Sequence, residues 1–441
     1  MVSPAGYSAR CFGRSSHLYS WRTCLQAGEK NAVNKAKLAL LVCLLLASSQ
    51  FIGVVKANFL PPPPPTVQVY IKADGTVEPA TTPIEKFGSV YVFADNLLNH
   101  TLEVQCDNIV IDGAGFTLKG VGVNAGVILS GRKNVTIKNL DVRNYVVSVR
   151  LQQSSNNVIS DNSMLTFMNV ILDSSSHNQI TGNNITAQDT GYGYGVQLNS
   201  GSSKNSILRN SFTDAGIGVR AIDGEYNLIS ENCFIRGGTN VLVKGDYNII
   251  SNNTMMDGRG GISLTGPALH NTIFGNTIKG TSKCGIKLYW GSSNTFYENY
   301  VANCAVGVKL GFDSEFPDRK VEDNVFYHNS FVNNTQDVSI GCVPDSNFWS
   351  KGEKGNYWSN YSGIDSDGDG VGDTAYIIDE NNRDYFPLME PIEASEHEMP
   401  DNVPEFPSWT PLLVALVAVV AISVVYKHKL NKHNQRRFDV N

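Results

Sequence analysis

Between residues 157 and 329, the apolar and polar positions of this chain repeat one short phrase. Each copy has an Asn, an apolar residue two positions later, a second Asn five positions after the first, and another apolar residue two positions after that. The apolar positions hold only Ile, Val, Met and Phe, and successive copies begin between 21 and 30 residues apart. The Asn pairs are Asn157/Asn162, Asn178/Asn183, Asn205/Asn210, Asn227/Asn232, Asn248/Asn253, Asn271/Asn276, Asn294/Asn299 and Asn324/Asn329.

A repeat of about 20–30 residues is typical of a solenoid, a propeller or a stacked array. The apolar residues lie two or five apart rather than three and four apart, which indicates short strands rather than helices. Coils of three such strands stack about 4.8 Å apart with parallel pairing. Asn suits the turns because its amide both donates and accepts hydrogen bonds. The sequence therefore predicts an all-β, right-handed parallel β-helix of about ten turns, with an Asn ladder and terminal caps.

The third strand of each coil is marked by a Gly followed by an apolar residue. The five clearest examples are Gly195-Val196, Gly218-Val219, Gly261-Ile262, Gly285-Ile286 and Gly307-Val308. An earlier pair, Asn134 and Asn139, keeps the five-residue spacing, but its apolar residues come one position late. We therefore expect that coil to have a different register from its successors.

Outside the repeat, composition divides the chain into further segments. Residues 38–55 are apolar and follow a basic stretch, which is typical of a secretory signal peptide, with an uncleaved anchor as the alternative. Residues 409–426 are uncharged and about long enough to span a bilayer, and basic residues follow them, so we expect a cytoplasmic tail. The expected order is a signal-peptide region at 1–57 (with 1–32 a misassigned start), a Pro-rich spacer at 58–66, an N-terminal cap at 67–107, the β-helix at 108–348, a C-terminal cap at 349–389, a linker at 390–408, a transmembrane helix at 409–426 and the tail at 427–441.

Net charge and cysteine spacing exclude several classes of protein. The net charge of −6 excludes nucleic-acid binding through bulk charge. The eight cysteines include no CxxC spacing, so neither a zinc site nor a disulfide framework is indicated, although a bridge between Cys284 and Cys304 stays open. Asn134 heads a sequon that would be poorly accessible if it joined the ladder. Five further sequons are compatible with glycosylation outside the membrane, at Asn99, Asn184, Asn252, Asn333 and Asn360.

Aromatic residues give the candidate ligand-binding surface. The interval 188–195 is longer than usual and carries Tyr192 and Tyr194, and such insertions form loops that often lie on the binding face. Tyr226, Tyr247 and His270 each precede a ladder Asn on consecutive coils, so we expect them to stack as a surface column. This column is interpreted either as a shelf for polysaccharide or as ordinary stacking.

Charged residues give the candidate catalytic group. Asp214, Arg236 and Asp257 each lie nine residues after a ladder Asn, so they should form a second column, with Asp246 and Arg259 nearby. A glycoside hydrolase needs two carboxylates about 5–10 Å apart, and a lyase needs acids that hold calcium near a basic residue. The alternative interpretation is an exposed charge ladder, which contributes little to stability.

A calcium loop is predicted in the C-terminal cap. Asp365, Asp367, Asp369 and Asp373 occupy positions 1, 3, 5 and 9 of an EF-hand-type loop, Gly370 allows the sharp turn at position 6, and Val371 would offer its carbonyl. Position 12 is Tyr376 instead of Glu, so Asp379 or Asp384 would have to supply the missing ligand. The pattern favours Ca²⁺, and a solvated acidic turn is the alternative.

The Asn-ladder coils, the segment 107–118 and the Gly-Asn-Tyr-Trp-Ser-Asn-Tyr segment at 355–361 resemble the NosD-type right-handed β-helix proteins, also described as carbohydrate-binding and sugar-hydrolase repeats. The resemblance covers about residues 67–389. The Val-Pro-Glu-Phe-Pro lead, the apolar span and the basic tail look like the C-terminal anchors of archaeal surface proteins, which implies an archaeal source. The namesake is a periplasmic accessory in copper-site assembly, but the sequence shows no His, Met or Cys cluster of copper-ligand character.

A fold of this kind hosts many activities, so function has to be argued from the site. The Asn-Thr-Asp, Asp-Asp and Gly-His-Gly motifs that would mark a polygalacturonase-like hydrolase are absent from the chain. We therefore expect a membrane-anchored extracellular protein that binds polysaccharide. A polysaccharide lyase or glycoside hydrolase is the first alternative, and a structural envelope component is the second.

Overall fold

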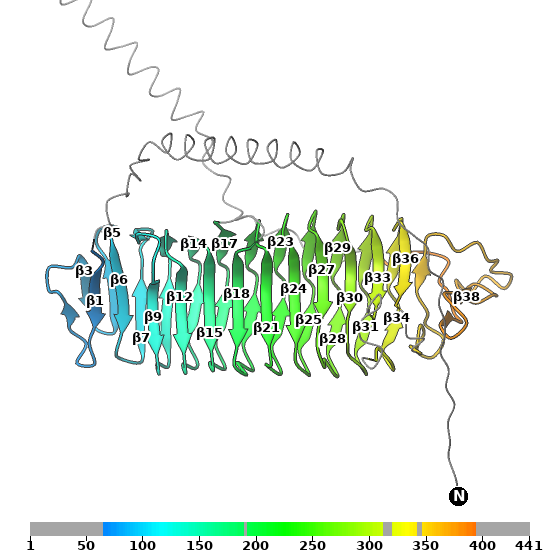
Figure 1. Ribbon diagram of the computed structural model, residues 1–441, viewed down its shortest axis with the longest axis horizontal. Coiled ribbons are helices and arrows are strands. Elements are labelled where there is room, and N and C mark those ends of the chain that lie inside the picture. Colours follow the sequence, from blue (N-terminus) through cyan, green and yellow to red (C-terminus); the bar gives the residue numbers. More distant parts are fainter. Residues whose placement is uncertain (1–64, 189–191, 312–319, 342–345, 394–441) are drawn as a thin grey trace, which may run out of the picture. The chain divides into compact units, whose positions relative to one another are not determined.

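The chain folds into three long, almost entirely parallel β-sheets (Figure 1), which wind around one hydrophobic core. The structure, a computed structural model, describes residues 65–188, 192–311, 320–341 and 346–393. Each coil contributes one short strand to sheet B, one to sheet C and one to sheet A, in that order along the chain. The right-handed parallel β-helix predicted from the repeat is confirmed.

The bounds of the strands follow the order in which neighbours pair. Sheet A has thirteen strands: β2 (Val77–Glu78), β1 (Val67–Ile71), β6 (His100–Val104), β9 (Ala125–Ser130), β12 (Val147–Gln152), β15 (Met168–Asp173), β18 (Tyr194–Asn199), β21 (Ile217–Ile222), β24 (Thr239–Lys244), β27 (Gly260–Leu264), β30 (Cys284–Leu288), β33 (Val306–Leu310) and β36 (Gln336–Ile340). Sheet B has twelve: β3 (Ile84–Phe87), β4 (Val90–Phe93), β7 (Ile109–Asp112), β10 (Val135–Lys138), β13 (Val158–Ser160), β16 (Gln179–Thr181), β19 (Ser206–Leu208), β22 (Leu228–Ser230), β25 (Ile249–Ser251), β28 (Thr272–Phe274), β31 (Thr295–Tyr297) and β34 (Val325–Tyr327). Sheet C has twelve: β5 (Leu97–Leu98), β8 (Thr117–Lys119), β11 (Asp141–Arg143), β14 (Ser163–Thr166), β17 (Asn184–Ala187), β20 (Ser211–Thr213), β23 (Cys233–Ile235), β26 (Thr254–Met256), β29 (Thr277–Lys279), β32 (Tyr300–Ala302), β35 (Ser330–Val332) and β37 (Tyr357–Trp358). The hairpin β38 (Tyr376–Ile377) and β39 (Arg383–Asp384) stands apart from these sheets.

The apolar positions of the repeat form continuous columns inside the solenoid. Ile159, Ile180 and Ile207 pair in register on successive strands of sheet B, and none has exposed side-chain surface. Phe212 and Phe234 continue a column in sheet C with their rings stacked 4.6 Å apart. Parallel pairing stacks equivalent residues of successive coils on one another. The apolar residues of the repeat therefore form one continuous core that excludes water.

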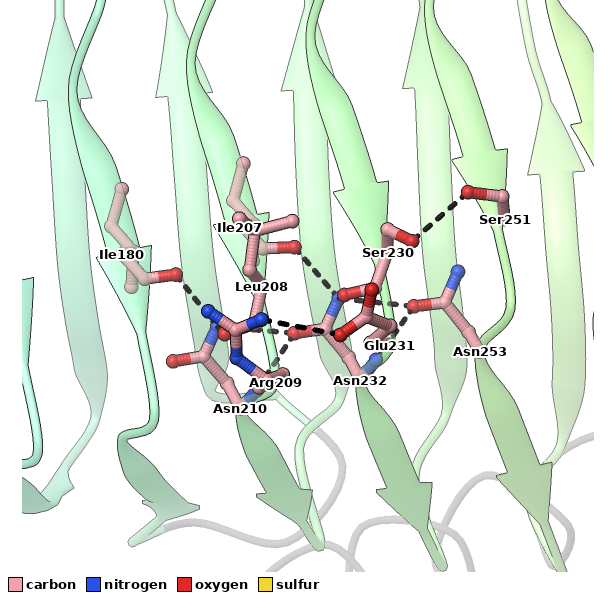
Figure 2. A network of polar contacts seen from close by, with 10 residues as sticks. All are labelled: Ile180, Ile207, Leu208, Arg209, Asn210, Ser230, Glu231, Asn232, Ser251 and Asn253. Atoms are coloured by element: carbon pink, nitrogen blue, oxygen red, sulfur yellow. Dashed lines mark hydrogen bonds and ion pairs between the residues drawn. The ribbon is translucent and has the colours of Figure 1, made fainter. Parts of the chain in front are cut away.

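Two Asn ladders run along the turns that border sheet B. The first Asn of each pair belongs to the first ladder and the second Asn to the second ladder, part of which is shown in Figure 2. Asn232 Oδ1 accepts hydrogen bonds from the backbone N–H and the side-chain Nδ2 of Asn210, both at 3.0 Å. Its own Nδ2 donates to Asn253 Oδ1 at 3.0 Å and to the Ile207 carbonyl at 2.8 Å. Each ladder amide therefore needs both its donor and its acceptor, which is the property of Asn that the sequence singled out.

Both ladders begin on a residue other than Asn, and the second ladder also ends on one. In the coil just before the ladders, Val135 and Leu140 occupy the Asn positions and donate their N–H groups to Asn157 and Asn162. Asn134 is exposed, because the shifted register predicted for its coil leaves it outside the ladder. Its sequon is therefore accessible, contrary to the expectation for a ladder position.

At the other end, the C-terminal cap closes the ladders. Asn382 Oδ1 accepts the N–H of Asn347, the last Asn of the first ladder, at 3.1 Å. Asp384 Oδ2 accepts the N–H of Asn356 at 2.7 Å and the indole N–H of Trp358 at 2.9 Å. Burial raises the pKa of the Asp384 carboxyl, against the hydrogen bonds from Trp358 and Asn356 that act to lower it.

Several sequence expectations are refined by the structure. Residues 67–107, expected as a cap, already supply parallel strands, because β1 pairs with β6 and β4 pairs with β7. Cys284 and Cys304 are not joined by a disulfide, so the bridge left open between them is not formed. Among the described residues no helix is long and apolar enough to cross a membrane. The expected signal peptide (1–57) and transmembrane helix (409–426) lie outside the described residues.

Candidate functional site

The outer face of sheet A carries a hollow across strands β24, β27 and β30, which lie side by side in Figure 1. Its volume is about 280 Å³. In the preceding coils the first outward position of the strand holds Met168, Tyr194 and Ile217, whereas here it holds Thr239, Gly260 and Cys284. A Cβ atom placed on Gly260 would meet no atom closer than 3.6 Å. The hollow therefore arises where bulky side chains give way to small ones on consecutive coils.

Cations line this hollow. Arg259 and Lys283 occupy the same position on adjacent coils, because β27 and β30 pair in register from Gly260 and Cys284 onward and the Lys283 N–H donates to the Arg259 carbonyl at 2.9 Å. Both side chains are exposed, and within the described residues neither forms an ion pair. Two like charges at paired positions repel each other, and an anion between them would lower this repulsion.

A third cation stands further along strand β30. The Lys287 ammonium lies 3.7 Å from the centre of the Tyr289 ring and contacts its hydroxyl. Thr239, Ser263 and Thr265 add hydroxyl groups to the lining. No carboxylate is present among the residues that line the hollow. It thus combines positive charge, hydroxyls and one aromatic ring, a set that suits an acidic, hydroxyl-rich ligand.

The predicted charge column is formed, and two of its three residues, Asp214 and Arg236, pair with each other. Asp214 and Arg236 make a two-bond ion pair with N–O distances of 3.1 and 3.2 Å. Asp214 raises the pKa of Arg236 first through its hydrogen bond and then through its charge, and Asp257 adds a further charge effect. All three residues have a φ near 55°, at the turn between sheets C and A. Their regular stacking favours the interpretation of an exposed charge ladder.

The remaining candidates for catalysis lie apart from one another. Asp246 is in the turn between sheets A and B, where its Oδ1 accepts the Leu269 N–H at 2.8 Å. Arg259 lines the hollow. The structure thus places Arg259 in a site and leaves Asp246 in a local turn contact, so the five predicted residues do not form one constellation.

The predicted aromatic column is also formed. Tyr226 and Tyr247 stack with ring centres 5.1 Å apart, and Tyr247 and His270 stack at 5.0 Å. Sugar rings bind aromatic side chains through the ring face, and in this column each face between neighbours is covered by the next ring, so mainly edges are open. Tyr192, 76% exposed, and Tyr194, at the start of β18, lie on the sheet A side and do not join this column.

Sequence reasoning missed Lys283, Lys287 and Tyr289. A signal was available, because the Gly-Ile pairs that mark the third strand align Gly261 with Gly285. That alignment already places Arg259 and Lys283 at one position of adjacent coils. The hollow itself could not be seen this way, because it depends on side-chain size in several coils together.

The acidic loop in the C-terminal cap gathers three of its predicted ligands. Oxygen atoms of Asp365, Asp367 and Asp369 lie within 4.8 Å of one another. Desolvation acts to raise the pKa of Asp365, but the N–H groups of Gly370, Gly368 and Asp369 together hold it below its ordinary value. These three carboxylates are hard oxygen donors of the kind that Ca²⁺ prefers.

The other expected ligands of this loop have different partners. Asp373 accepts a hydrogen bond from the Ser366 hydroxyl at 2.6 Å, and Val371 forms a bridge with Leu388. Asp379 accepts from the N–H groups of residues 381 and 382, and Asp384 is buried against the ladder. Neither is therefore placed to supply the ligand that is missing at position 12.

Comparison with known proteins identifies relatives of the repeat region. The family model described as periplasmic copper-binding protein (NosD) matches residues 95–248 and 241–363. The probable ABC transporter binding protein NosD of Pseudomonas aeruginosa is 35% identical over 104 residues, and that of Stutzerimonas stutzeri is 34% identical over 104 residues. Each match covers 24% of this chain and 22% of the relative, so the chain matches about a fifth of the length of these curated relatives.

Solved structures of similar fold act on polysaccharides. An alginate lyase from Paenibacillus sp. strain FPU-7 has 15% identity and a TM-score of 0.40, covering 48% of this chain and 88% of the lyase. The catalytic domain of a GH87 α-1,3-glucanase has 16% identity and a TM-score of 0.46, covering 61% of this chain and 59% of that domain.

Proposed function

The chain belongs to the NosD family, and from this premise we propose that it is an exported β-helix protein that binds polysaccharide against the outer face of sheet A. The periplasmic setting in the family description supports export. The observation that carries the proposal is the hollow on sheet A, where Arg259, Lys283 and Lys287 stand beside hydroxyl groups and the Tyr289 ring. Extended strands in register also offer a polymer one repeating surface along the stack.

The family description names copper. Copper sites in proteins use imidazole, thiolate and thioether ligands. Among the described residues, the group of three or more His, Cys, Asp and Glu close enough to hold a metal ion is Asp365, Asp367 and Asp369. Three carboxylates suit a hard cation rather than copper, so this group does not fit copper.

A polysaccharide lyase is the alternative that a specific observation favours. β-Elimination on a uronate breaks the C5–H bond and the glycosidic C4–O bond, forms a C4=C5 double bond and returns a proton to the departing C4 oxygen. It needs a cation beside the substrate carboxylate and a base that removes the C5 proton. Arg259 and Lys283 offer the first, and the contact between Lys287 and Tyr289 offers a candidate for the second. Hydrolysis is less well supported, because the lining of the hollow has no carboxylate and hydrolysis needs two. A structural envelope role would leave the hollow without a ligand.

Binding and catalysis are separated by one measurement on the purified full-length chain. We expect the chain to be retained on a series of immobilised acidic and neutral polysaccharides, without formation of new reducing or unsaturated ends. New unsaturated ends that disappear in the Lys287→Ala variant would establish the lyase instead. Absence of retention on every polysaccharide would reject the proposed function and leave the structural role.

We also propose that Ca²⁺ stabilises the C-terminal cap through Asp365, Asp367 and Asp369, with the Val371 carbonyl and Asp373 as further ligands. Carboxylate oxygens that lie within 4.8 Å of one another support this assignment. A ligand at 100 times its Kd adds about 2.7 kcal/mol to the stability of the unit that binds it. We expect Ca²⁺ to raise the Tm of the cap transition by a few degrees. The Asp365→Asn/Asp367→Asn variant should lose this shift, and Glu353→Gln should keep it; equal shifts in both variants would reject the site.

Membrane anchoring is a further proposal. The apolar stretch 409–426 and the basic residues after it support a C-terminal helix that tethers the β-helix to the outside of the cell membrane. An exported, tethered body would hold its bound polysaccharide near the cell surface.

A further inference from the structure

We propose that the hollow across β24, β27 and β30 is a binding site for an acidic polysaccharide, whose carboxylate or sulfate groups are held by Arg259 and Lys283. The inference rests on the proposed function and deepens it by naming the ligand class. The two cations occupy paired positions on adjacent coils, whose backbones lie about 4.8 Å apart.

The positive charge of Arg259 and Lys283 does not continue to the equivalent positions of the neighbouring coils. In the same position, the coils on either side carry Gly238 and Ala305. Some cations on the surface meet an acid on the adjacent coil, as Arg236 meets Asp214 and Arg209 meets Glu231. Lys287 and Lys309, in contrast, are a second pair of cations at paired positions. Arg259 and Lys283 have no such partner among the described residues, so an anionic group from a ligand would relieve their repulsion.

The spread of charge indicates a polymer rather than a single small anion. Lys287 lies four residues after Lys283 on strand β30, which is about 13 Å along an extended strand. One carboxylate can bridge Arg259 and Lys283, whereas the Lys287 ammonium lies over the Tyr289 ring, further along the chain. A chain with repeated acidic groups can occupy both ends of the hollow, while its hydroxyl groups meet Thr239, Ser263 and Thr265.

The small residues of the hollow make room for such a chain. A side chain on Gly260 would project into it, because its Cβ would have only Cys284 O at 3.6 Å and Thr239 Oγ1 at 3.9 Å as near neighbours. Ile217 and Met168 stand at the same position in earlier coils, so a large residue here is compatible with the fold. Gly260→Leu therefore blocks the hollow without changing its charge.

The test uses the purified full-length chain with polygalacturonate and with its fully methyl-esterified form, which has the same backbone without the charge. We expect binding to polygalacturonate to exceed binding to the ester at least tenfold and to weaken as salt is raised. The Arg259→Gln/Lys283→Gln variant should bind polygalacturonate about 100-fold more weakly, since each charge-assisted hydrogen bond contributes on the order of tenfold. Gly260→Leu should lower the affinity at least tenfold.

A matched variant separates this site from general surface charge. Arg209→Gln/Lys133→Gln removes the same number of charges from exposed positions outside the hollow, and we expect its affinity to stay within twofold of the wild type. Free galacturonate should not compete at concentrations that saturate the site with polymer; effective competition would assign the site to a single anion and overturn the polymer. Equal binding of polygalacturonate and its ester, or unchanged binding by Arg259→Gln/Lys283→Gln, would overturn the inference while leaving polysaccharide binding intact.

Discussion

Replacing Asn232 by Ala is expected to lower the free energy of unfolding by about 3–6 kcal/mol. The change removes the acceptor of the Asn210 N–H and Nδ2–H groups and the donor to the Ile207 carbonyl. All of these groups lie in the dry interior of the second ladder, and a buried polar group left without a partner costs about 1–3 kcal/mol. Urea unfolding followed by circular dichroism measures the loss, and Asn381→Ala, at an exposed position of the cap, should change stability by less than about 0.5 kcal/mol.

An exchange between Asn and Asp should be tolerated at the end of this ladder but not in its middle. Asn232→Asp keeps the acceptor but loses both donations and points a carboxylate at the Ile207 carbonyl. It should destabilise the fold at least as strongly as Asn232→Ala. Asp384 only accepts, from Asn356, Trp358 and Phe386. Asp384→Asn should therefore cost only about 1–2 kcal/mol, because one N–H loses its acceptor. If the two exchanges were equally damaging, onward donation would not be what selects Asn.

The end of the ladders marks the limit of what the repeat could predict about the fold. The eight Asn pairs share a spacing of five residues, and that regularity is enough to predict coils, register and core. The next pair, Asn347 and Asn356, is nine residues apart, and its partners Asn382 and Asp384 follow 35 and 28 residues later. The ladder continues there through amides that are close in space but irregular in sequence, so only coordinates reveal it.

The stacked columns around the candidate site could be predicted from the sequence, but the hollow could not. Columns of like residues follow directly from register, so the stacking of Tyr226 on Tyr247 and of Arg236 on Asp214 could be foreseen. A hollow is instead made by missing side chains, such as that of Gly260. Arg259 was singled out as a candidate beside acids, but its neighbour in the structure is another cation, Lys283, which favours the proposed anion binding over acid–base catalysis.

Truncating Trp358 to Ala is expected to lower the free energy of unfolding by about 4–6 kcal/mol and to expose the end of the solenoid. The Trp358 ring is 1% exposed and lies between Phe331, at 4.6 Å, and Tyr376, at 4.4 Å. Removing a buried Trp side chain costs about 3–5 kcal/mol. The buried Asp384 carboxylate would also lose its bond from the indole N–H, at a cost of about 1–3 kcal/mol.

Because Trp358 joins the last coil to hairpin β38–β39, its loss should act on assembly as well as on stability. Strand edges left without cover pair with other molecules, so we expect Trp358→Ala to elute as larger species on size-exclusion chromatography and to be cleaved faster between residues 360 and 390. Trp358→Phe keeps an aromatic ring in the stack but loses the indole N–H and part of the buried volume, so it should cost about 2–3 kcal/mol, less than Trp358→Ala, and stay monodisperse if the wild type is. Tyr385→Ala, at a side chain that is 61% exposed in the same cap, should match the wild type in both assays. If Trp358→Ala unfolded with the wild-type midpoint and gave no larger species, the cap would not be what protects the end of the stack.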